Sequence, residues 1–571
     1  MKSAKKIFCA VSALTLVSLA YAQDFTDEFY DDYSSSYEDS TPAVTVGGSV
    51  ELNARAYVEA SDYSFVTKKN PISGDETTEI DFEDRPSFGE NKVDAFPTAR
   101  LNFDYVGANS DLSVKLKYDK TSIYEGYYWD ILDEFTARAY VGNAQFEAGK
   151  MRIVWGKGDK LHVLDNFNAN DYLDYIIPDY IDRRIAEPMF RAVYSTNSNI
   201  KVEGIYTPMM TADRLADSGV WQPKATKTLT NTLEGLVMES VTATNCYGLL
   251  AASQFSADKL YPDTHKLKYG QYGGRVTFTA GSVDLGFSYY NGRNKQPSAN
   301  LEPIINKKAA EGMIEKLNSP VLQNVISSVA PQMGLLLPTL EARLNKYNYK
   351  FLDYLASESY STSLLDYDKM QVFGFEAAAV LFGRLNSRLE VAYNLTEDIA
   401  GDDPWVHNNS LGWVAGFDMD LPIHNVNINV QNQGSYILNN HKIGTAEFQP
   451  FKEDYDLLKT SMIGYVLANA LLKYSYGAYD VDYDPTGCYT NNKLVVDITD
   501  TWNHEKIKLD LKGIWGIERG DVIVIPTVTF IVKDDWNINL SGMYIWCKDS
   551  DSEFDGWQRN SFAQIGVKYQ F

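Results

Sequence analysis

Apolar and polar residues alternate along most of the chain, and this period of two predicts β-strands. In residues 50–59 the even-numbered positions are apolar and the odd-numbered positions are polar. Residues 100–106 and 111–118 alternate in the same way on both sides of a short turn, which predicts a β-hairpin. The predicted strands lie near 50–59, 100–106, 111–118, 134–142, 144–154, 188–196, 199–207, 271–280, 282–291, 371–382, 385–396, 410–421, 425–436, 493–502, 506–516, 521–532, 537–547 and 561–571. A further apolar stretch, 455–474, is of undecided type and could add two strands.

The connections between these strands alternate between very short turns and long segments. The short turns join 106 to 111, 142 to 144, 196 to 199, 280 to 282 and 382 to 385, whereas several other connections exceed 30 residues. Long connections without a regular pattern are unusual inside a compact soluble domain. They are typical of outer-membrane barrels, which have short turns on one side and long loops on the other.

Strand length and hydropathy favour a membrane barrel over a soluble sandwich. The strands are about 9 to 11 residues long, which is the length that crosses a bilayer when strands are tilted. Aromatic residues gather toward the strand ends, as interfacial girdles do. Mean hydropathy is −0.30 and no apolar run is long enough for a transmembrane helix. We therefore predict an all-β fold, a transmembrane antiparallel β-barrel of about 18 strands (16 to 20), in the bacterial outer membrane.

The N-terminus has the features of a signal peptide, residues 1–22. A lysine-rich start and the apolar run Ile7–Leu19 precede a small-x-small cleavage site at 20–22, so the chain is predicted to be exported. Residues 23–45 are rich in Asp, Glu and Ser and predict an acidic, disordered periplasmic tail. The remaining residues, 46–571, are predicted to form the barrel.

The chain is strongly acidic. Its formal net charge is −24, and loss of the three lysines of the signal peptide takes it to −27. Such a surplus repels a phosphate backbone and argues against a nucleic-acid partner. The side chains predicted to line the pore carry both signs, so the surplus is expected on the tail and the loops. The predicted pore-lining residues are Arg55, Arg100, Lys115, Lys117, Arg138, Arg275, Arg388, Lys508, Glu51, Asp104, Glu203 and Glu390.

The last predicted strand ends on an aromatic residue. Ile565, Val567, Tyr569 and Phe571 share its apolar face. Such a strand is similar to the C-terminal assembly signal of bacterial outer-membrane proteins. It predicts recognition by the barrel-assembly machinery and contact with outer-membrane lipid.

Residues 149–172 carry the most specific pattern in the chain. They read Trp155-Gly-x-x-Asp159 at the end of a strand, then Asp165-x-x-Asn168-x-x-Asp171-Tyr172. With segments 184–188 and 206–208, this pattern resembles a poorly characterised group of large outer-membrane barrels akin to porins. That group commonly has proline where Ala169 stands. The resemblance implies a porin-like barrel and gives no information on the solute.

Segment 155–187 is a candidate constriction of the pore. It is long and acidic, and two arginines follow its acidic run. Opposed charges inside a pore create a transverse field that selects solutes by charge and size. The alternative is an ordered surface loop whose Asp and Asn residues cap turns. The predicted constriction residues are Trp155, Asp159, Asp165, Asp171, Tyr172, Arg183 and Arg184.

Segment 300–357 is the one region with a helical period, and it lies in the long insertion 291–370. Ser319-Pro320 predicts the start of a helix there. The segment could cap or plug the pore. Alternatively, it forms an exposed extracellular subdomain.

Enzymatic, cofactor and metal chemistry has little support. None of the six His stands in a zinc-binding pattern, and no nucleophile elbow is present. Asp480–Asp484 is spaced like the start of a calcium loop, but Pro485 stands where an EF-hand requires glycine. We therefore predict no enzymatic activity, no cofactor and no EF-hand metal site. Cys488 and Cys547 could form a disulfide or stay reduced.

Two functions remain open. The first is an outer-membrane channel for small hydrophilic solutes, because a barrel of 16 to 18 strands leaves an aqueous interior. Segments 155–187 and 300–357 would narrow or gate this channel. The second is a surface ligand-binding or adhesin-type barrel whose pore is closed and whose long loops do the binding. The oligomeric state, monomer or trimer, stays open.

Overall fold

The structure is a computed structural model. It describes residues 43–57, 64–69, 76–81, 93–124, 126–159, 161–174, 180–216, 221–223, 261–329, 338, 341–342, 344–347, 364–447, 474–533 and 535–571. The signal peptide 1–22, nearly all of the tail 23–45 and nearly all of the stretch 455–474 lie outside the described residues.

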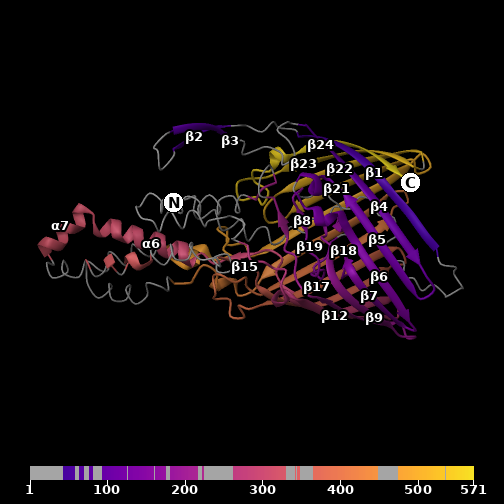
Figure 1. Cartoon of the computed structure of the whole chain (residues 1–571), viewed down its shortest axis with the longest axis horizontal. Coiled ribbons are helices and arrows are strands. Elements are labelled where there is room, and N and C mark those ends of the chain that lie inside the picture. Colours follow the sequence, from indigo (N-terminus) through magenta and orange to yellow (C-terminus); the bar gives the residue numbers. More distant parts are fainter. Residues whose placement is uncertain are drawn as a thin grey trace.

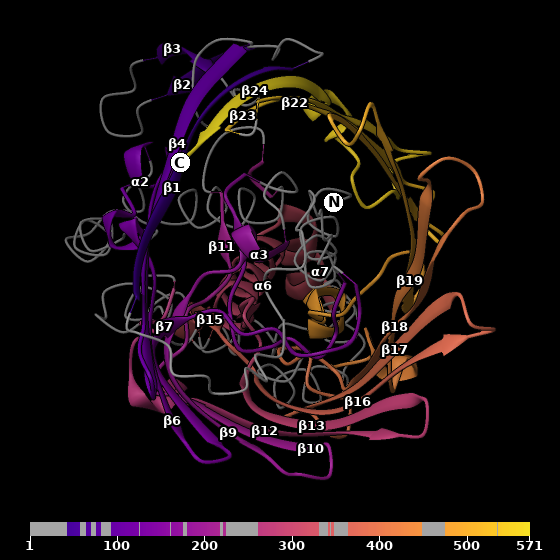
Figure 2. The same ribbon diagram turned by 90° about the vertical axis from the view of Figure 1, so that its right-hand side faces the viewer.

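Eighteen antiparallel strands form one closed barrel (Figures 1 and 2). The strands are β1 (Ala43–Tyr57), β4 (Val93–Val106), β5 (Ser110–Tyr118), β6 (Leu132–Val141), β7 (Ala144–Met151), β9 (Glu187–Ser195), β10 (Ile200–Thr207), β12 (Gln271–Ala280), β13 (Val283–Arg293), β16 (Lys369–Leu381), β17 (Leu385–Thr396), β18 (Ser410–Asp420), β19 (Asn427–Ile437), β20 (Thr490–Trp502), β21 (Ile507–Gly516), β22 (Val522–Lys533), β23 (Trp536–Trp546) and β24 (Phe562–Gln570). Each predicted strand corresponds to one of them. The barrel closes because β1 pairs with β4 on one side and with β24 on the other.

Two strands begin about seven residues earlier than the alternating pattern predicted. β1 begins at Ala43, within the range expected as tail, and β4 begins at Val93. The two strands pair from Ala43 opposite Val106 to Ala56 opposite Val93. Each extension therefore pairs with the predicted part of the other strand, 43–49 with 100–106 and 93–99 with 50–56. This pairing is not visible in either segment alone.

Connections at the two ends of the barrel differ, as predicted. Tight turns such as Gly107–Asn109 and Gly142–Asn143 join strands at one end, called here the short-turn end. The longer connections all lie at the opposite end, called here the long-connection end. Ala43 pairs with Val106 and therefore lies at the short-turn end, where the C-terminus also lies (Figure 1).

The two faces of the strands have opposite character. On β1, Val50 and Leu52 are more than half exposed, whereas Asn53 and Arg55 are buried inside the barrel. Ile565 and Val567 on β24 also face outward. An apolar outer surface around a polar interior is the arrangement of a transmembrane β-barrel, since lipid is the solvent outside.

The long insertion contains two described helices, α6 (Glu302–Leu317) and α7 (Pro320–Val329). α7 begins at Pro320, as predicted. Both extend away from the long-connection end, beyond the ring of strands (Figure 1). These helices therefore do not fill the barrel, and their position agrees with an external subdomain. Within the described part of the chain, no helix has both the length and the apolar character to cross a membrane.

Candidate functional site

The connection from β7 to β9 folds into the barrel. Residues 152–186, called here the internal loop, contain the short strand β8 (Asp171–Tyr172) and the helical turn α3 (Tyr180–Arg183). β8 pairs with β11 (Arg214–Leu215) of the β10–β12 connection. Figure 2 shows α3 and β11 inside the ring of strands. The predicted segment 155–187 is thus an internal element and not an external surface loop.

Asn168 fastens the two ends of the internal loop together. Its side-chain carbonyl accepts a hydrogen bond from the Ile153 N–H at 2.9 Å. Its amide group donates to the carbonyls of Met151, at 3.0 Å, and Ile185, at 2.9 Å. Asn168 is 1% exposed, so solvent water cannot take over its hydrogen bonds to these three backbone groups.

One side of the loop is held by the wall formed by β17 and β19. Glu390, fully buried on β17, accepts hydrogen bonds from the main-chain N–H groups of Gly158, at 2.6 Å, and Val163, at 2.9 Å. Its Oε1 also lies 2.8 Å from His162 Nδ1. Asp159 contacts Arg388 at 3.5 Å and accepts from amide side chains of β19.

The other side of the loop is held by β1 and β4. Asp174 forms a two-point ion pair with Arg55, at 3.0 and 3.2 Å. Asp182, on α3, pairs in the same way with Arg100, at 2.8 and 2.5 Å. Paired N–H donors matched to a carboxylate fix orientation as well as distance. The internal loop is therefore anchored to two separate walls.

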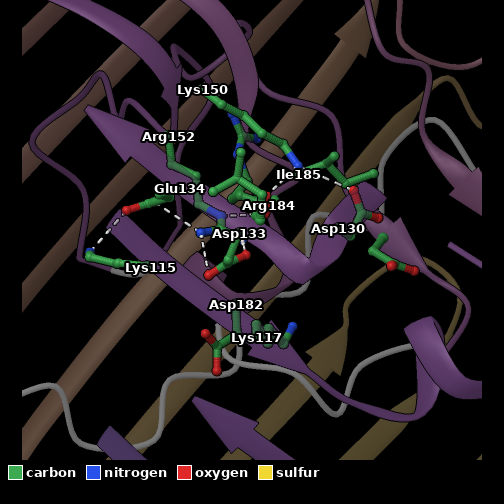
Figure 3. Close-up of polar contacts among 12 residues, drawn as sticks. Lys115, Lys117, Asp130, Asp133, Glu134, Lys150, Arg152, Asp182, Arg184 and Ile185 are labelled. Atoms are coloured by element: carbon green, nitrogen blue, oxygen red, sulfur yellow. Dashed lines mark hydrogen bonds and ion pairs between the residues drawn. The ribbon is translucent and has the colours of Figure 1, made fainter. Parts of the chain in front are cut away.

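A charged network at the root of the loop ties it to β5 and β6. Arg152 binds Asp133 and also donates to Glu134 at 2.9 Å (Figure 3). Glu134 in turn pairs with Lys115 at 2.9 Å. Arg184 pairs with Asp165 at 2.7 Å within the loop. Charges of both signs therefore alternate across this part of the interior.

Apolar side chains form two clusters within the otherwise polar barrel interior. Trp155 is 1% exposed, packs edge-on against Phe167, and donates from Nε1 to Glu203 at 3.1 Å. Phe167 packs in turn against Tyr290 on β13. A second cluster joins Leu161, Tyr172 and Leu173 of the loop to apolar inward positions on β18 and β20 to β24; these are Val414, Val495, Ile514, Ile523, Met543, Ile545 and Phe562. The expectation of a mainly polar interior did not include this apolar cluster.

The twelve residues predicted to line the pore all lie on the inward face of their strands. Most of them have a partner there. Besides the contacts above, Lys117 pairs with Asp119 (2.9 Å), Arg138 with Glu147 (2.7 Å) and Arg275 with Glu376 (2.5 Å), and Asp104 accepts from Ser113 (2.6 Å).

Other charged residues of the interior were missed. Arg191 bridges Glu147, at 3.0 Å, and Glu203, at 2.7 Å, on neighbouring strands. Glu376 on β16 was also missed; it forms the ion pair with Arg275 on β12. All of these stand at inward positions of predicted strands, so counting every charged inward position would have found them.

Of the other constriction residues, Asp171 pairs with Arg214 at 2.9 Å, and Arg183 stacks over the ring of Tyr172. Asp171 and Tyr172 thus join the internal loop to the β10–β12 connection through the β8–β11 pair.

Three long connections, β13–β16, β17–β18 and β19–β20, are fastened to one another near the barrel mouth. His407 Nδ1 lies 2.8 Å from Asp482, and the His407 main-chain N–H donates to Asp368 at 3.0 Å. Burial lowers the pKa of His407, but the charge and hydrogen bond of Asp482, together with the charges of Asp368 and Asp480, outweigh it and raise that pKa to about 9. Burial raises the pKa of nearby Asp480 to about 6.

The described residues contain no group of three His, Cys, Asp or Glu side chains placed to hold a metal ion. Cys488 and Cys547 do not form a disulfide with each other. Cys246 lies outside the described residues.

A family model described as "Protein of unknown function (DUF1302)" matches residues 4–571. The chain belongs to this family. The DUF1302 match includes every strand of the barrel and the whole internal loop. No curated protein matches the chain by sequence.

Several solved outer-membrane proteins are similar to the chain in fold. OccK3 (OpdO) of Pseudomonas aeruginosa is 7% identical, with 92% of this chain and 95% of that chain covered and a TM-score of 0.38. A BenF-like porin from Pseudomonas fluorescens is 7% identical, with 93% and 98% covered and a TM-score of 0.40. Wzi of Escherichia coli, described as a carbohydrate-binding β-barrel involved in capsule assembly, is 11% identical, with 91% and 84% covered and a TM-score of 0.37.

Proposed function

We propose that this protein is an outer-membrane channel for small hydrophilic solutes, narrowed by the internal loop. The observation that carries the proposal is a loop anchored to two walls inside a closed 18-stranded barrel. A barrel of this size is too wide for wall side chains alone to fill. An internal loop then sets the width of the path that solutes follow.

The charged anchors are proposed to set the selectivity of the narrowed region. Asp159, Asp174 and Asp182 on the loop face Arg388, Arg55 and Arg100 on the walls. Because these charges neutralise one another in pairs, selectivity follows from the local field and not from the net charge of −24. We therefore expect weak selection between small cations and anions.

The C-terminal strand is proposed to be the segment that the barrel-assembly machinery recognises. Ile565 and Val567 face outward toward the lipid, and Phe571 lies at its end, at the short-turn end of the barrel. The Phe571 main chain exchanges two hydrogen bonds with Gly48 of β1, at 2.9 and 3.0 Å. Recognition and barrel closure would then involve the same strand.

Planar-bilayer conductance of the refolded, full-length barrel tests the channel. Met151 lies opposite Glu187 across β7 and β9, so a two-residue hairpin turn can replace residues 152–186. This variant is expected to open with a larger single-channel conductance than the parent protein.

The matched control shortens a different long connection. Ala299 and Leu365 are paired, so a turn can replace residues 300–364, which include both external helices. That variant should conduct like the parent, because α6 and α7 lie beyond the ring of strands (Figure 1). No openings from a natively folded parent protein would refute the channel.

The closed-pore alternative is favoured by one specific observation. Leu161, Tyr172 and Leu173 pack into an apolar cluster with the wall of β18 and β20 to β24. Such packing could seal that side of the interior. A loop-replacement variant that conducts, beside a parent that does not, would establish that the internal loop closes the pore.

A further inference from the structure

We infer that a polar cavity beside the internal loop, toward the long-connection end of the barrel, binds a small, neutral, hydroxyl-rich molecule, such as a simple sugar or polyol. This inference deepens the proposed function by naming its solute class. Binding of this molecule can be tested separately from conductance through the barrel.

The cavity lies between the internal loop and the connections at the mouth. Asn166 and Asn170 of the loop form one side, His407 of the β17–β18 connection a second, and Ser435 of β19 a third. Its volume is about 240 Å³. This lies just below the range of typical ligand pockets, roughly 300–1,000 Å³. The cavity therefore suits a small solute or a single sugar unit.

Nearly all charges of the cavity wall are already paired with oppositely charged protein groups. The pairs are His162 with Glu390, Arg184 with Asp165, Lys295 with Glu187, His407 with Asp482 and Lys493 with Glu553, while Arg293 donates to the Tyr367 carbonyl and Asp213 accepts from Asn170 and Gln296. A charged ligand would enter a site where nearly every wall charge already has an ion-pair partner, and where the carboxylate of Asp213 is hydrogen-bonded by Asn170 and Gln296. It would lose its hydration without gaining a counter-charge. A neutral ligand avoids this cost.

Four polar atoms of the wall have no hydrogen-bond partner among the described residues. They are Asn166 Nδ2, Asn170 Oδ1, His407 Nε2 and Ser435 Oγ. His407 and Ser435 are 7% and 5% exposed, so these two side chains are more than nine-tenths buried at the cavity. A buried polar group without a partner is costly, and native proteins rarely keep one without a reason.

The chemistry of these atoms selects hydroxyl groups. Asn166 Nδ2 is a donor, and His407 Nε2 is a donor while the imidazole stays protonated beside Asp482. Asn170 Oδ1 is an acceptor, and Ser435 Oγ can be either. A ligand must therefore accept at some positions and donate at others. Adjacent hydroxyl groups do both. Val163, Met370 and Ile437 also line the cavity and provide apolar surface for the ligand's carbon skeleton.

Calorimetric titration of the folded, detergent-solubilised protein tests the inference. The neutral probes are glucose and inositol, and the charged probes of similar size are gluconate and glucosamine. Saturable binding of a neutral probe is expected. Ser435→Ala and Asn166→Ala should each weaken it about fivefold, as expected for one lost hydrogen bond. Since neither removed group has a partner in the described structure, both variants should fold normally.

Thr527→Ala is the matched control. Thr527 is also a buried hydroxyl residue on an inward face, but it does not line the cavity, so its loss should leave binding unchanged. Tighter binding of gluconate or glucosamine than of glucose would overturn the inference. So would the absence of saturable binding by both neutral probes, or unchanged binding in both cavity variants. Binding without channel openings would refute the channel alone.

Discussion

Glu390 holds the internal loop at Gly158, whose main-chain N–H donates to Oε1 of this buried carboxylate at 2.6 Å. The chain turns sharply just before this contact. Gly156 has φ +121°, and a Cβ atom there would lie 2.0 Å from the same Oε1. The glycine of the Trp-Gly-x-x-Asp pattern thus permits both the turn and the close approach to the wall.

Gly156→Ala should release this side of the internal loop. The added methyl group clashes with Glu390 Oε1, so either the Glu390 side chain or the loop must shift. Either shift disturbs the hydrogen bonds from the Gly158 and Val163 N–H groups to this carboxylate. We expect an intact barrel by circular dichroism and faster amide hydrogen exchange in residues 156–163. Gly142→Ala is the control, since Gly142 also has positive φ but no atom lies within 4 Å of its added Cβ. Equal exchange in the two variants would contradict this account.

Asn168→Ala should loosen both ends of the internal loop. It removes the partners of three buried backbone groups, each of which costs about 1–3 kcal/mol when left unsatisfied. Amide exchange should rise at Ile153 and along the loop, and single-channel conductance should become larger or noisier. Asn197→Ala, in an exposed short turn, should change neither measurement.

The Arg100–Asp182 pair should behave as a coupled unit. Asp182→Asn leaves Arg100 without its carboxylate, and Arg100→Gln does the reverse. A double-mutant cycle in urea unfolding should give a coupling of about 0.5–3 kcal/mol. Since both side chains are partly exposed, the lower part of that range is expected. Exchanging the two residues should restore part of the loss. Strictly additive effects would show that the pair does not anchor the loop.

Alkaline pH should weaken the His407–Asp482 contact. The pKa of His407 is about 9 in the folded protein, above its ordinary value of about 6.5. The stabilisation is therefore fully present below about pH 6.5 and is lost as the pH rises through about 9. Amide exchange of residues 403–409, corrected for the intrinsic rate, should rise between pH 7 and pH 10. In His407→Gln the corrected rate should already be high at pH 7. A His407 titration by NMR near pH 6.5 would contradict the prediction.

Phe571→Ala should slow assembly without changing the finished barrel. The ring of Phe571 lies against Gly48, but the main-chain bonds between the two residues do not need the side chain. We expect slower membrane insertion by the assembly machinery and unchanged unfolding of inserted protein. Gln570→Ala, one residue earlier, is the control.

The sequence predicted the strands because alternation is a local property, visible in segments such as 50–59 and 561–571. The inward position of the internal loop depends on contacts that are distant in the chain. Gly158 and Glu390 are 232 residues apart, and no local pattern indicates that they meet. The resemblance at Asp165 and Asn168 pointed to the segment that folds into the barrel. The three hydrogen bonds by which Asn168 joins the two ends of this loop could be seen only in the structure.

The apolar cluster was missed for a different reason. Ile514 and Met543 stand at inward positions among polar residues, so an alternating pattern assigns them no function. They belong to one cluster with Leu161, which stands on a segment read as an acidic loop. Which inward apolar residues are covered can be decided only once the occupant of the interior is known.

The pairing of β1 with β24 has a consequence for biogenesis. Ser49 of β1 lies opposite Gln570 of β24, so β1 can pair with β24 only after nearly the whole chain has been synthesised. Until then the sheet has two open edges, which invite pairing with foreign strands. Contacts this distant in sequence are slow to form. A chain truncated before residue 562 would have no route to a sealed wall, so release from the ribosome must precede completion of the fold.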